Sequence, residues 1–133
     1  MKKPRKEESN QSVPAKSELE VLKILWKDGP ATVRYVHDAL NKDIKSVQYT
    51  STLKLMQVMT EKGMLERDET NMKHIYHPLL EEKKTMGMVL QKFLHSVYDG
   101  SMSNLLVAFL NNGKPSKKEL EKIKEVLSKM EKK

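Results

Sequence analysis

Apolar positions recur every three to four residues along most of the chain, and this spacing predicts helices. The first helix should begin at residues 17–20, a capping box in which Ser17 is the N-cap. The turn at residues 28–30 should end this helix, because the residue before a proline disfavours helix. Thr32 should cap a second helix that ends near Asn41.

A third helix is predicted over Val47–Lys62, where Gly63 follows and stops it. One stripe of this helix should face the two helices before it, and it consists of Thr52, Leu55, Met56 and Met59. The opposite side carries amide, hydroxyl and ammonium groups, on Gln48, Thr50, Ser51 and Lys54. Leu53 and Val58 fit neither side. Both could pack on a neighbouring element, and Leu53 could instead meet a thymine methyl group.

A β-hairpin should follow within residues 64–78, as two short alternating runs around a turn at residues 69–71. We expect Leu65 and Ile75 to point into the core, with Tyr76 near its rim. A helix with a hydrogen-bonding face followed by a short β-ribbon is the layout of a winged helix-turn-helix. In that fold the helix fits the DNA major groove, and the ribbon lies beside it on the backbone.

The hydrophobic pattern after Leu79 predicts longer helices. Acidic residues 81–82 open one helix, and Ser101 starts the next. Residues 111–115 should form a loop, followed by a last helix that begins at the capping box of residues 116–119. The main apolar residues of these stripes are Val89, Leu90, Phe93, Leu94, Val97, Leu105, Leu106, Phe109, Leu120, Ile123 and Leu127.

The expected fold class is therefore mainly α with a small β-hairpin (α+β). We expect a disordered basic tail at residues 1–16, a winged-helix DNA-binding domain at residues 17–79 and a helical dimerisation domain at residues 80–133. The last 54 residues carry many large apolar side chains but are too few for a good core. Two copies could bury each other's stripes, so we expect a homodimer. The alternative is a monomer whose last helices fold back on the winged helix.

Net charge is +7, which favours a polyanionic partner, but the charge is unevenly distributed. Residues 1–16 carry +3 and residues 80–133 carry +4, whereas residues 17–79 are neutral overall. The tail is therefore either a frayed terminus or a basic arm that touches DNA phosphates. Residues 44–60 contain no Asp or Glu, so this surface can approach phosphates without like-charge repulsion.

Candidate DNA contacts lie on the third helix, before it, and on the hairpin. They are Lys45, Gln48, Tyr49, Thr50, Ser51, Lys54, Arg67, Asn71, Lys73 and His74. Amide, hydroxyl and ammonium groups read base edges and bind phosphates, and Tyr49 could stack on a sugar or meet a methyl group. The competing interpretation is a solvated helix face in a winged helix that binds another protein. The neutral charge of residues 17–79 supports this competitor.

Composition excludes several other classes of protein. The chain has no cysteine, which removes disulfides, thiolate metal sites and cysteine nucleophiles and fits a cytoplasmic location. We expect no membrane span and no secretory signal, since no run of 18 apolar residues occurs and the N-terminus lacks an apolar core. The histidines do not have metal-ligand spacing, and no catalytic motif occurs. We therefore expect no enzyme activity, no metal and no cofactor.

Five segments resemble those of one family of bacterial repressors. Residues 18–26, ELEVLKILW, resemble the EWEVMKxLW opening of the BlaI/MecI/CopY family, the penicillinase repressor family. Residues 50–53 and 61–65 resemble that family's recognition helix and its exit into the wing. Residues 76–79 resemble its YYPL end of the hairpin, and residues 100–127 follow its spacing.

The resemblance implies repression of promoters with dyad operators, such as genes for β-lactam resistance or related stress responses. It also implies double-stranded operator DNA as a partner and adds a membrane sensor protease as a candidate one. Three departures limit what carries over. The family's cleaved Asn-Phe pair is matched by Ala108-Phe109, and its copper-binding cysteine motif is absent. Tyr49 replaces the proline that often precedes the family's recognition threonine, which changes what is expected of the operator.

Overall fold

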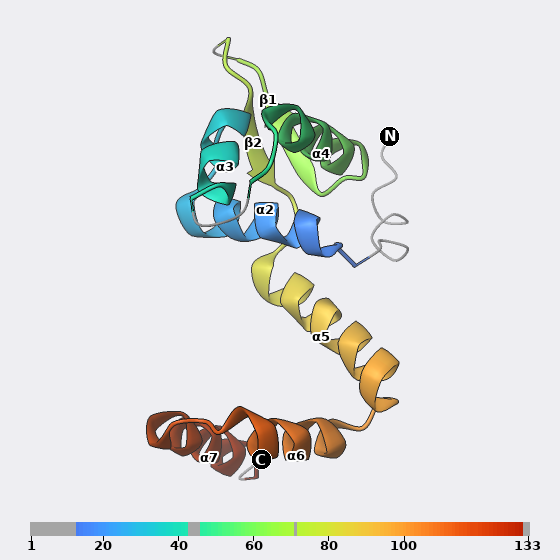
Figure 1. The fold of residues 1–133 in the computed structure, drawn as a ribbon, viewed down its shortest axis with the longest axis vertical. Helices are drawn as coiled ribbons and strands as arrows, with labels where there is room; N and C mark the ends of the chain where they lie inside the picture. The colour runs from blue at the N-terminus through green and yellow to red at the C-terminus, as the bar shows by residue number, and fades with distance from the viewer. Residues whose placement is uncertain (1–12, 43–45, 71, 132–133) are drawn as a thin grey trace. The chain divides into compact units, whose positions relative to one another are not determined.

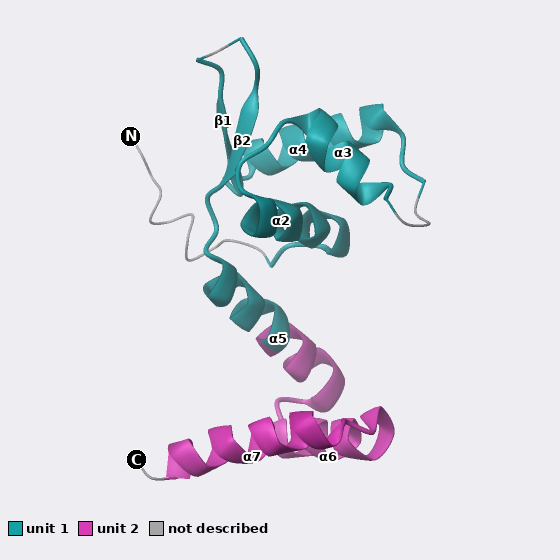
Figure 2. Ribbon diagram, turned by 90° about the vertical axis from the view of Figure 1, so that its left-hand side faces the viewer, with its two compact units in different colours: residues 1–90 teal, residues 91–133 magenta. Residues whose placement is uncertain are grey.

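The computed structural model describes residues 13–42, 46–70 and 72–131 and is mainly α with one β-hairpin, as predicted (Figure 1). Its elements are α2 (Lys16–Asp28), α3 (Val33–Leu40), α4 (Tyr49–Glu61), β1 (Leu65–Asp68), β2 (Ile75–Pro78), α5 (Glu82–Tyr98), α6 (Met102–Gly113) and α7 (Lys117–Glu131). The chain forms two compact units, Met1–Leu90 and Gln91–Lys133, coloured separately in Figure 2. The predicted tail lies mostly outside the described residues, and the predicted boundary at Leu79 stays a prediction.

The start of α2 differs from the prediction. The helix begins one residue before Ser17, so the N-cap is Ala15 and the expected Ser17 cap is wrong. Ala15 has no side-chain acceptor, but the Glu18 carboxylate accepts the Ala15 backbone N–H at 2.9 Å. Glu18 therefore occupies the third position of the helix, where a capping box places its acidic residue.

The core of the first unit joins three helices and the hairpin. Its buried side chains are Val21, Leu22, Leu25, Ala31, Val33, Val36, Met56, Met59, Met64, Leu65 and Tyr76. The predicted inner stripe of α4 is confirmed, since Thr52, Met56 and Met59 have no exposed area and Leu55 packs against the cluster. Each fully buried Leu or Met contributes about 1.5–3 kcal/mol, so this cluster dominates the stability of the unit.

The third helix begins two residues later than predicted. Val47 is not helical, because its backbone N–H donates to the Asn41 side-chain oxygen at 2.7 Å. Asn41 is the C-cap of α3, as predicted, and Thr32 is its N-cap, accepting the Tyr35 N–H at 3.1 Å. The Asn41 side chain, which follows α3, thus fixes how the chain enters α4.

The hairpin register corrects the predicted core face. β1 pairs antiparallel with β2, and Arg67 lies opposite Tyr76 while Asp68 lies opposite Ile75. Opposed residues share a face, so Leu65 and Tyr76 lie on one side and Ile75 lies on the other. Tyr76 is 1% exposed and belongs to the core, whereas Ile75 is only half-buried. The predicted rim position of Tyr76 and core position of Ile75 are therefore wrong.

Two further contacts attach the hairpin to the helices. Ala31 pairs with Tyr76 through reciprocal backbone hydrogen bonds of 3.2 and 2.8 Å, which adds one residue of a third strand. After the hairpin, the Leu80 carbonyl accepts the indole N–H of Trp26 at 3.0 Å. The only tryptophan of the chain thus lies at the junction between α2 and the end of the hairpin.

The second unit contains the end of α5, all of α6 and all of α7. Ser101 and Ser116 accept the backbone N–H of the residue three positions later, at 3.1 Å each, so both predicted caps are confirmed. The predicted loop at residues 111–115 is too long, because α6 continues to Gly113. The Asn112 side chain donates to the Ala108 carbonyl inside the helix, and Lys114 then takes a left-handed conformation with φ of 46°.

Candidate nucleic-acid interface

The exposed face of α4 gathers the polar residues that the sequence indicated. Gln48, Thr50, Ser51 and Lys54 are all exposed, at the N-terminal end of the helix. Gln57 follows Lys54 by three residues and is also exposed, which extends this row by a residue that we did not predict. No acidic side chain occurs within residues 46–60, so the row presents donors and acceptors without a negative charge. This chemistry suits base edges and phosphates.

The buried side of α4 is held by a polar network. The His37 ring nitrogen Nδ1 lies 3.2 Å from the hydroxyl of Thr52, which is fully buried. The Asn41 side-chain nitrogen donates to the His37 carbonyl at 2.9 Å. Asn41 also receives the Val47 N–H, so a single network spans α3, the entry loop and α4. These contacts fix the rotation of α4 and thereby which residues it exposes.

Tyr49 is placed differently from its predicted neighbours in the row. Its ring is half-buried, with the Arg34 guanidinium carbon 4.6 Å from the ring centroid. The His37 ring meets it edge-on, with centroids 5.4 Å apart. Tyr49 therefore packs between two side chains of α3, and its predicted contact with a sugar or methyl group stays a prediction.

Arg34 was not among the predicted site residues. It lies on α3, close to the start of α4, and it is one of only three arginines in the chain. Asp38 on the same helix lies 3.8 Å from its guanidinium, and both side chains are largely exposed. Such exposed pairs contribute little, so Asp38 leaves the guanidinium available for another anion. The only sequence signal that could have pointed to Arg34 was that the chain contains few arginines.

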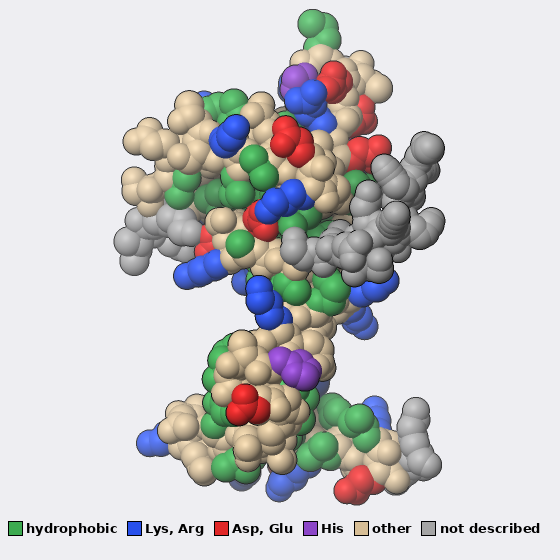
Figure 3. Space-filling model, turned by 90° about the vertical axis from the view of Figure 1, so that its right-hand side faces the viewer, with side chains coloured by type: hydrophobic (Ala, Val, Ile, Leu, Met, Phe, Trp, Pro, Cys, Tyr) green, Lys and Arg blue, Asp and Glu red, His purple; other side chains and the backbone are tan. Residues whose placement is uncertain are grey.

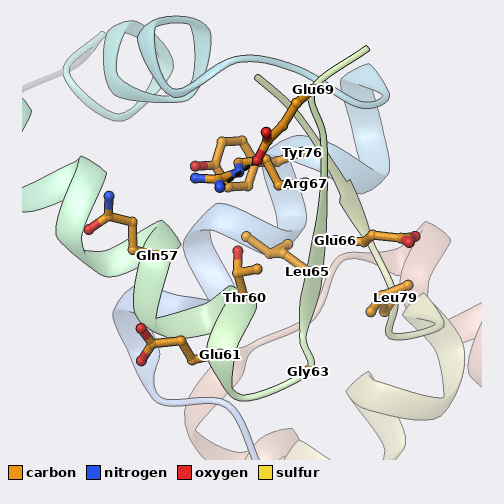
Figure 4. Close-up of a pocket in the computed structure, with 10 residues that line it drawn as sticks. All are labelled: Gln57, Thr60, Glu61, Gly63, Leu65, Glu66, Arg67, Glu69, Tyr76 and Leu79. Atoms are coloured by element: carbon orange, nitrogen blue, oxygen red, sulfur yellow. Dashed lines mark ion pairs between the residues drawn. The ribbon is translucent and has the colours of Figure 1, made fainter. Parts of the chain in front are cut away.

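Arg67, which we predicted as a wing contact, is engaged within the hairpin. Its guanidinium is hydrogen-bonded to Tyr76 and paired with Glu69, and these two partners raise its pKa, in that order of importance (Figure 4). The pocket beside it, of about 710 Å³, is also lined by Glu61 and Glu66. The positive charge of Arg67 is therefore already paired with Glu69, a poor setting for a phosphate.

The other predicted residues divide into three groups. Lys73 and His74 are exposed between the hairpin strands. Lys45 and Asn71 lie outside the described residues. Leu53 packs against the core cluster, in agreement with the first of its two interpretations, and Val58 is half-buried.

The described residues contain no group of His, Cys, Asp or Glu side chains that could hold a metal ion. Within the same part of the chain, no helix is long and apolar enough to cross a membrane.

Comparison with known proteins gives one family. The sequence profile described as penicillinase repressor matches residues 14–129. The penicillinase repressor of Bacillus licheniformis is 28% identical over 119 residues, covering 84% of this chain and 86% of that protein. The methicillin resistance regulatory proteins MecI of Staphylococcus aureus (strain N315) and Staphylococcus epidermidis are each 24% identical over 113 residues, covering 85% of this chain and 91% of theirs.

Proposed function

The chain belongs to the penicillinase repressor family, and from this membership we propose that it binds dyad operator DNA as a homodimer and represses transcription there. The family consists of transcriptional repressors, which are not enzymes. We also propose that α4 reads the DNA, that the second unit joins the two copies, and that the protein is cytoplasmic.

The observation that carries the DNA proposal is the exposed polar row on α4. Thr50, Ser51 and Lys54 project from the first two turns, and the network around His37 and Asn41 holds the opposite side of the helix. A helix with a fixed rotation and an outer face that is acid-free up to Gln57 can enter a major groove and present the same groups each time. Sequence preference then comes from hydrogen bonds to base edges, since residues 17–79 are neutral overall.

The dimer proposal rests on exposed apolar side chains in the second unit. The exposed ones are Phe93, Val97, Met102, Leu106, Val107, Phe109, Leu110, Val126, Leu127 and Met130. Figure 3 shows hydrophobic side chains at the surface of this unit. Leu94 is the one large apolar side chain of the described part of this unit that is nearly fully buried. A second copy would cover these side chains, since a soluble monomer rarely leaves so many large apolar side chains exposed.

The DNA proposal is tested by titrating the full chain with duplexes selected from a random pool and with shuffled duplexes of the same composition. A protein that makes about 6–10 phosphate contacts should lose about 10³–10⁵ in affinity between 50 and 200 mM salt. The selected sequences should show two half-sites about 34–36 Å apart, or a multiple of this distance. No binding to any duplex at low salt would favour the winged helix that binds another protein.

The dimer proposal has its own measurement. Sedimentation of the free protein at low micromolar concentration should give the mass of two chains. A folded, compact monomer would contradict it and would favour helices that fold back on the first unit.

We do not propose that a protease inactivates this protein. The pair matched to the family's cleavage site, Ala108-Phe109, lies inside α6, and its first residue is Ala instead of Asn. A membrane sensor protease therefore remains a candidate partner implied by the resemblance alone.

A further inference from the structure

A second pocket lies between the start of α3, the first turns of α4 and the hairpin loop. Its volume is about 480 Å³. Leu53 and Met72 give it an accessible apolar floor, since Val33 and Tyr76, which also line it, are almost fully buried. Arg34, Lys73 and His74 supply basic groups. None of the described residues that line it is acidic, in contrast to the larger pocket, which is lined by Glu61, Glu66 and Glu69. Of these two pockets, the smaller one is suited to an anion.

The position of this pocket relates it to the polar row on α4. Tyr49 and Leu53 line the pocket, and the next residue after each, Thr50 and Lys54, belongs to the exposed row. Consecutive helical residues are about 100° apart around the axis, so the row and the pocket are adjacent surfaces of one helix. A duplex whose base edges meet the row therefore brings a backbone strand to the pocket.

The Arg34 guanidinium is oriented before any ligand binds. It stacks over the Tyr49 ring at 4.6 Å, and the edge-on contact with His37 holds that ring. A guanidinium held over a ring can still donate two parallel hydrogen bonds to a phosphate from its N–H edge. The Asp38 contact of 3.8 Å is long and exposed, so a phosphate can replace it at little cost.

We propose that this pocket holds one sugar–phosphate unit of the DNA backbone, with Arg34 and Lys73 on the phosphate and the deoxyribose over the apolar floor. The inference rests on the proposed function and adds Arg34 to it as a backbone-binding residue. An inorganic phosphate would meet only the basic groups and leave the floor uncovered, whereas a sugar–phosphate covers both. Backbone contacts of this kind set the register in which α4 meets the bases.

The main test compares Arg34→Ala and Lys73→Ala with Lys23→Ala, which removes the same charge from an exposed position on α2. Binding is measured across salt concentrations on one selected duplex and on its shuffled counterpart. Each pocket variant should weaken both duplexes alike, by about tenfold, and reduce the salt slope by about one. Lys23→Ala should match the wild type on both duplexes.

Two further measurements separate a phosphate contact from a structural role. Arg34→Lys should restore the salt slope but only part of the affinity, because an ammonium lacks the planar fork. A duplex made neutral at one backbone position per half-site by a methylphosphonate should bind the wild type more weakly. Arg34→Ala should bind this modified duplex no more weakly than it binds the unmodified one. Variants are compared only if their unfolding midpoint, followed by Trp26 fluorescence, matches that of the wild type.

Four outcomes would overturn the inference. If Arg34→Ala and Lys73→Ala bind both duplexes with wild-type affinity and an unchanged salt slope, the pocket does not contact the backbone. Loss confined to the selected duplex would assign Arg34 to positioning α4 through Tyr49. If the wild type binds neither duplex, the proposed DNA binding itself fails and this inference fails with it. Capture of an acidic peptide without DNA binding would have the same meaning.

Discussion

The Glu18 carboxylate accepts a hydrogen bond from the Lys62 ammonium at 2.7 Å, joining the first turn of α2 to the C-cap of α4. Glu18 is 5% exposed, whereas the Lys62 side chain is 46% exposed. Burial opposes ionisation of Glu18, but the hydrogen bonds from Lys62 and Ala15 and the charge on Lys62 outweigh it. The pKa of Glu18 therefore lies below its ordinary value.

Replacing Glu18 by Gln should lower the free energy of unfolding by about 1–2 kcal/mol at neutral pH. Because the pKa of Glu18 is lowered in the fold, its stabilisation is present above the ordinary glutamate pKa. It is lost as pH falls through the lower folded pKa. Urea unfolding followed by Trp26 fluorescence should thus show the two proteins converging in acid. Glu66→Gln, at an exposed strand position, is the control, and a pH-independent difference would contradict the ion pair's role.

Asn41→Ala should weaken both the fold and DNA binding. It leaves the Val47 N–H without its side-chain acceptor and should cost about 1–2 kcal/mol. Operator affinity should fall further than this instability explains, since Val47 leads directly into α4. Asn41→Asp keeps the acceptor but loses the donor to the His37 carbonyl, so it should be intermediate. Normal affinity of a folded Asn41→Ala would separate the network from DNA reading.

The double substitution Thr50→Ala and Lys54→Ala should remove discrimination between selected and shuffled duplexes. Each good base contact contributes about 1–3 kcal/mol of discrimination, so the preference should fall about tenfold or more. Sedimentation should still give the mass of two chains, because both residues belong to the first unit. If the preference is retained, α4 is not the element that reads sequence.

Phe109→Glu should weaken the dimer about tenfold or more, because the ring is 43% exposed on α6 and a carboxylate there would be buried in the interface. Ser128→Glu adds the same charge at an exposed polar position on α7 and should leave the dimer intact. Sedimentation over a concentration series measures both. Equal effects of the two substitutions would indicate charge repulsion instead of a specific interface.

The elements that depend on nearby residues were predicted best. Thr32, Ser101 and Ser116 cap helices through hydrogen bonds to residues three positions away, so the local sequence contains all the partners. The burial of Tyr76 could not be read in the same way. Ile75 and Tyr76 are both apolar neighbours in a strand, and only the register with β1 and the pairing with Ala31 decides which faces the core.

In the candidate site, too, features set by nearby residues were predicted and features set by long-range contacts were not. The exposed row on α4 follows from helical periodicity and the buried stripe, so its members were predicted. Arg34 was missed because its contact with Tyr49 joins two helices whose approach the sequence does not specify. The engagement of Arg67 was partly visible, since Glu69 is close in sequence, but its bond to Tyr76 depends on the strand pairing.

The pairing of Ala31 with Tyr76 also sets the order of events during folding. α2, α3 and α4 can form from local contacts, but this two-bond bridge requires closing the chain across α3, α4 and β1. Closure of so long a loop is slow compared with helix formation, so the bridge should be among the last contacts made. Its two amide protons then exchange with solvent only when the hairpin detaches. Hydrogen exchange of these two protons should therefore report how often the hairpin opens.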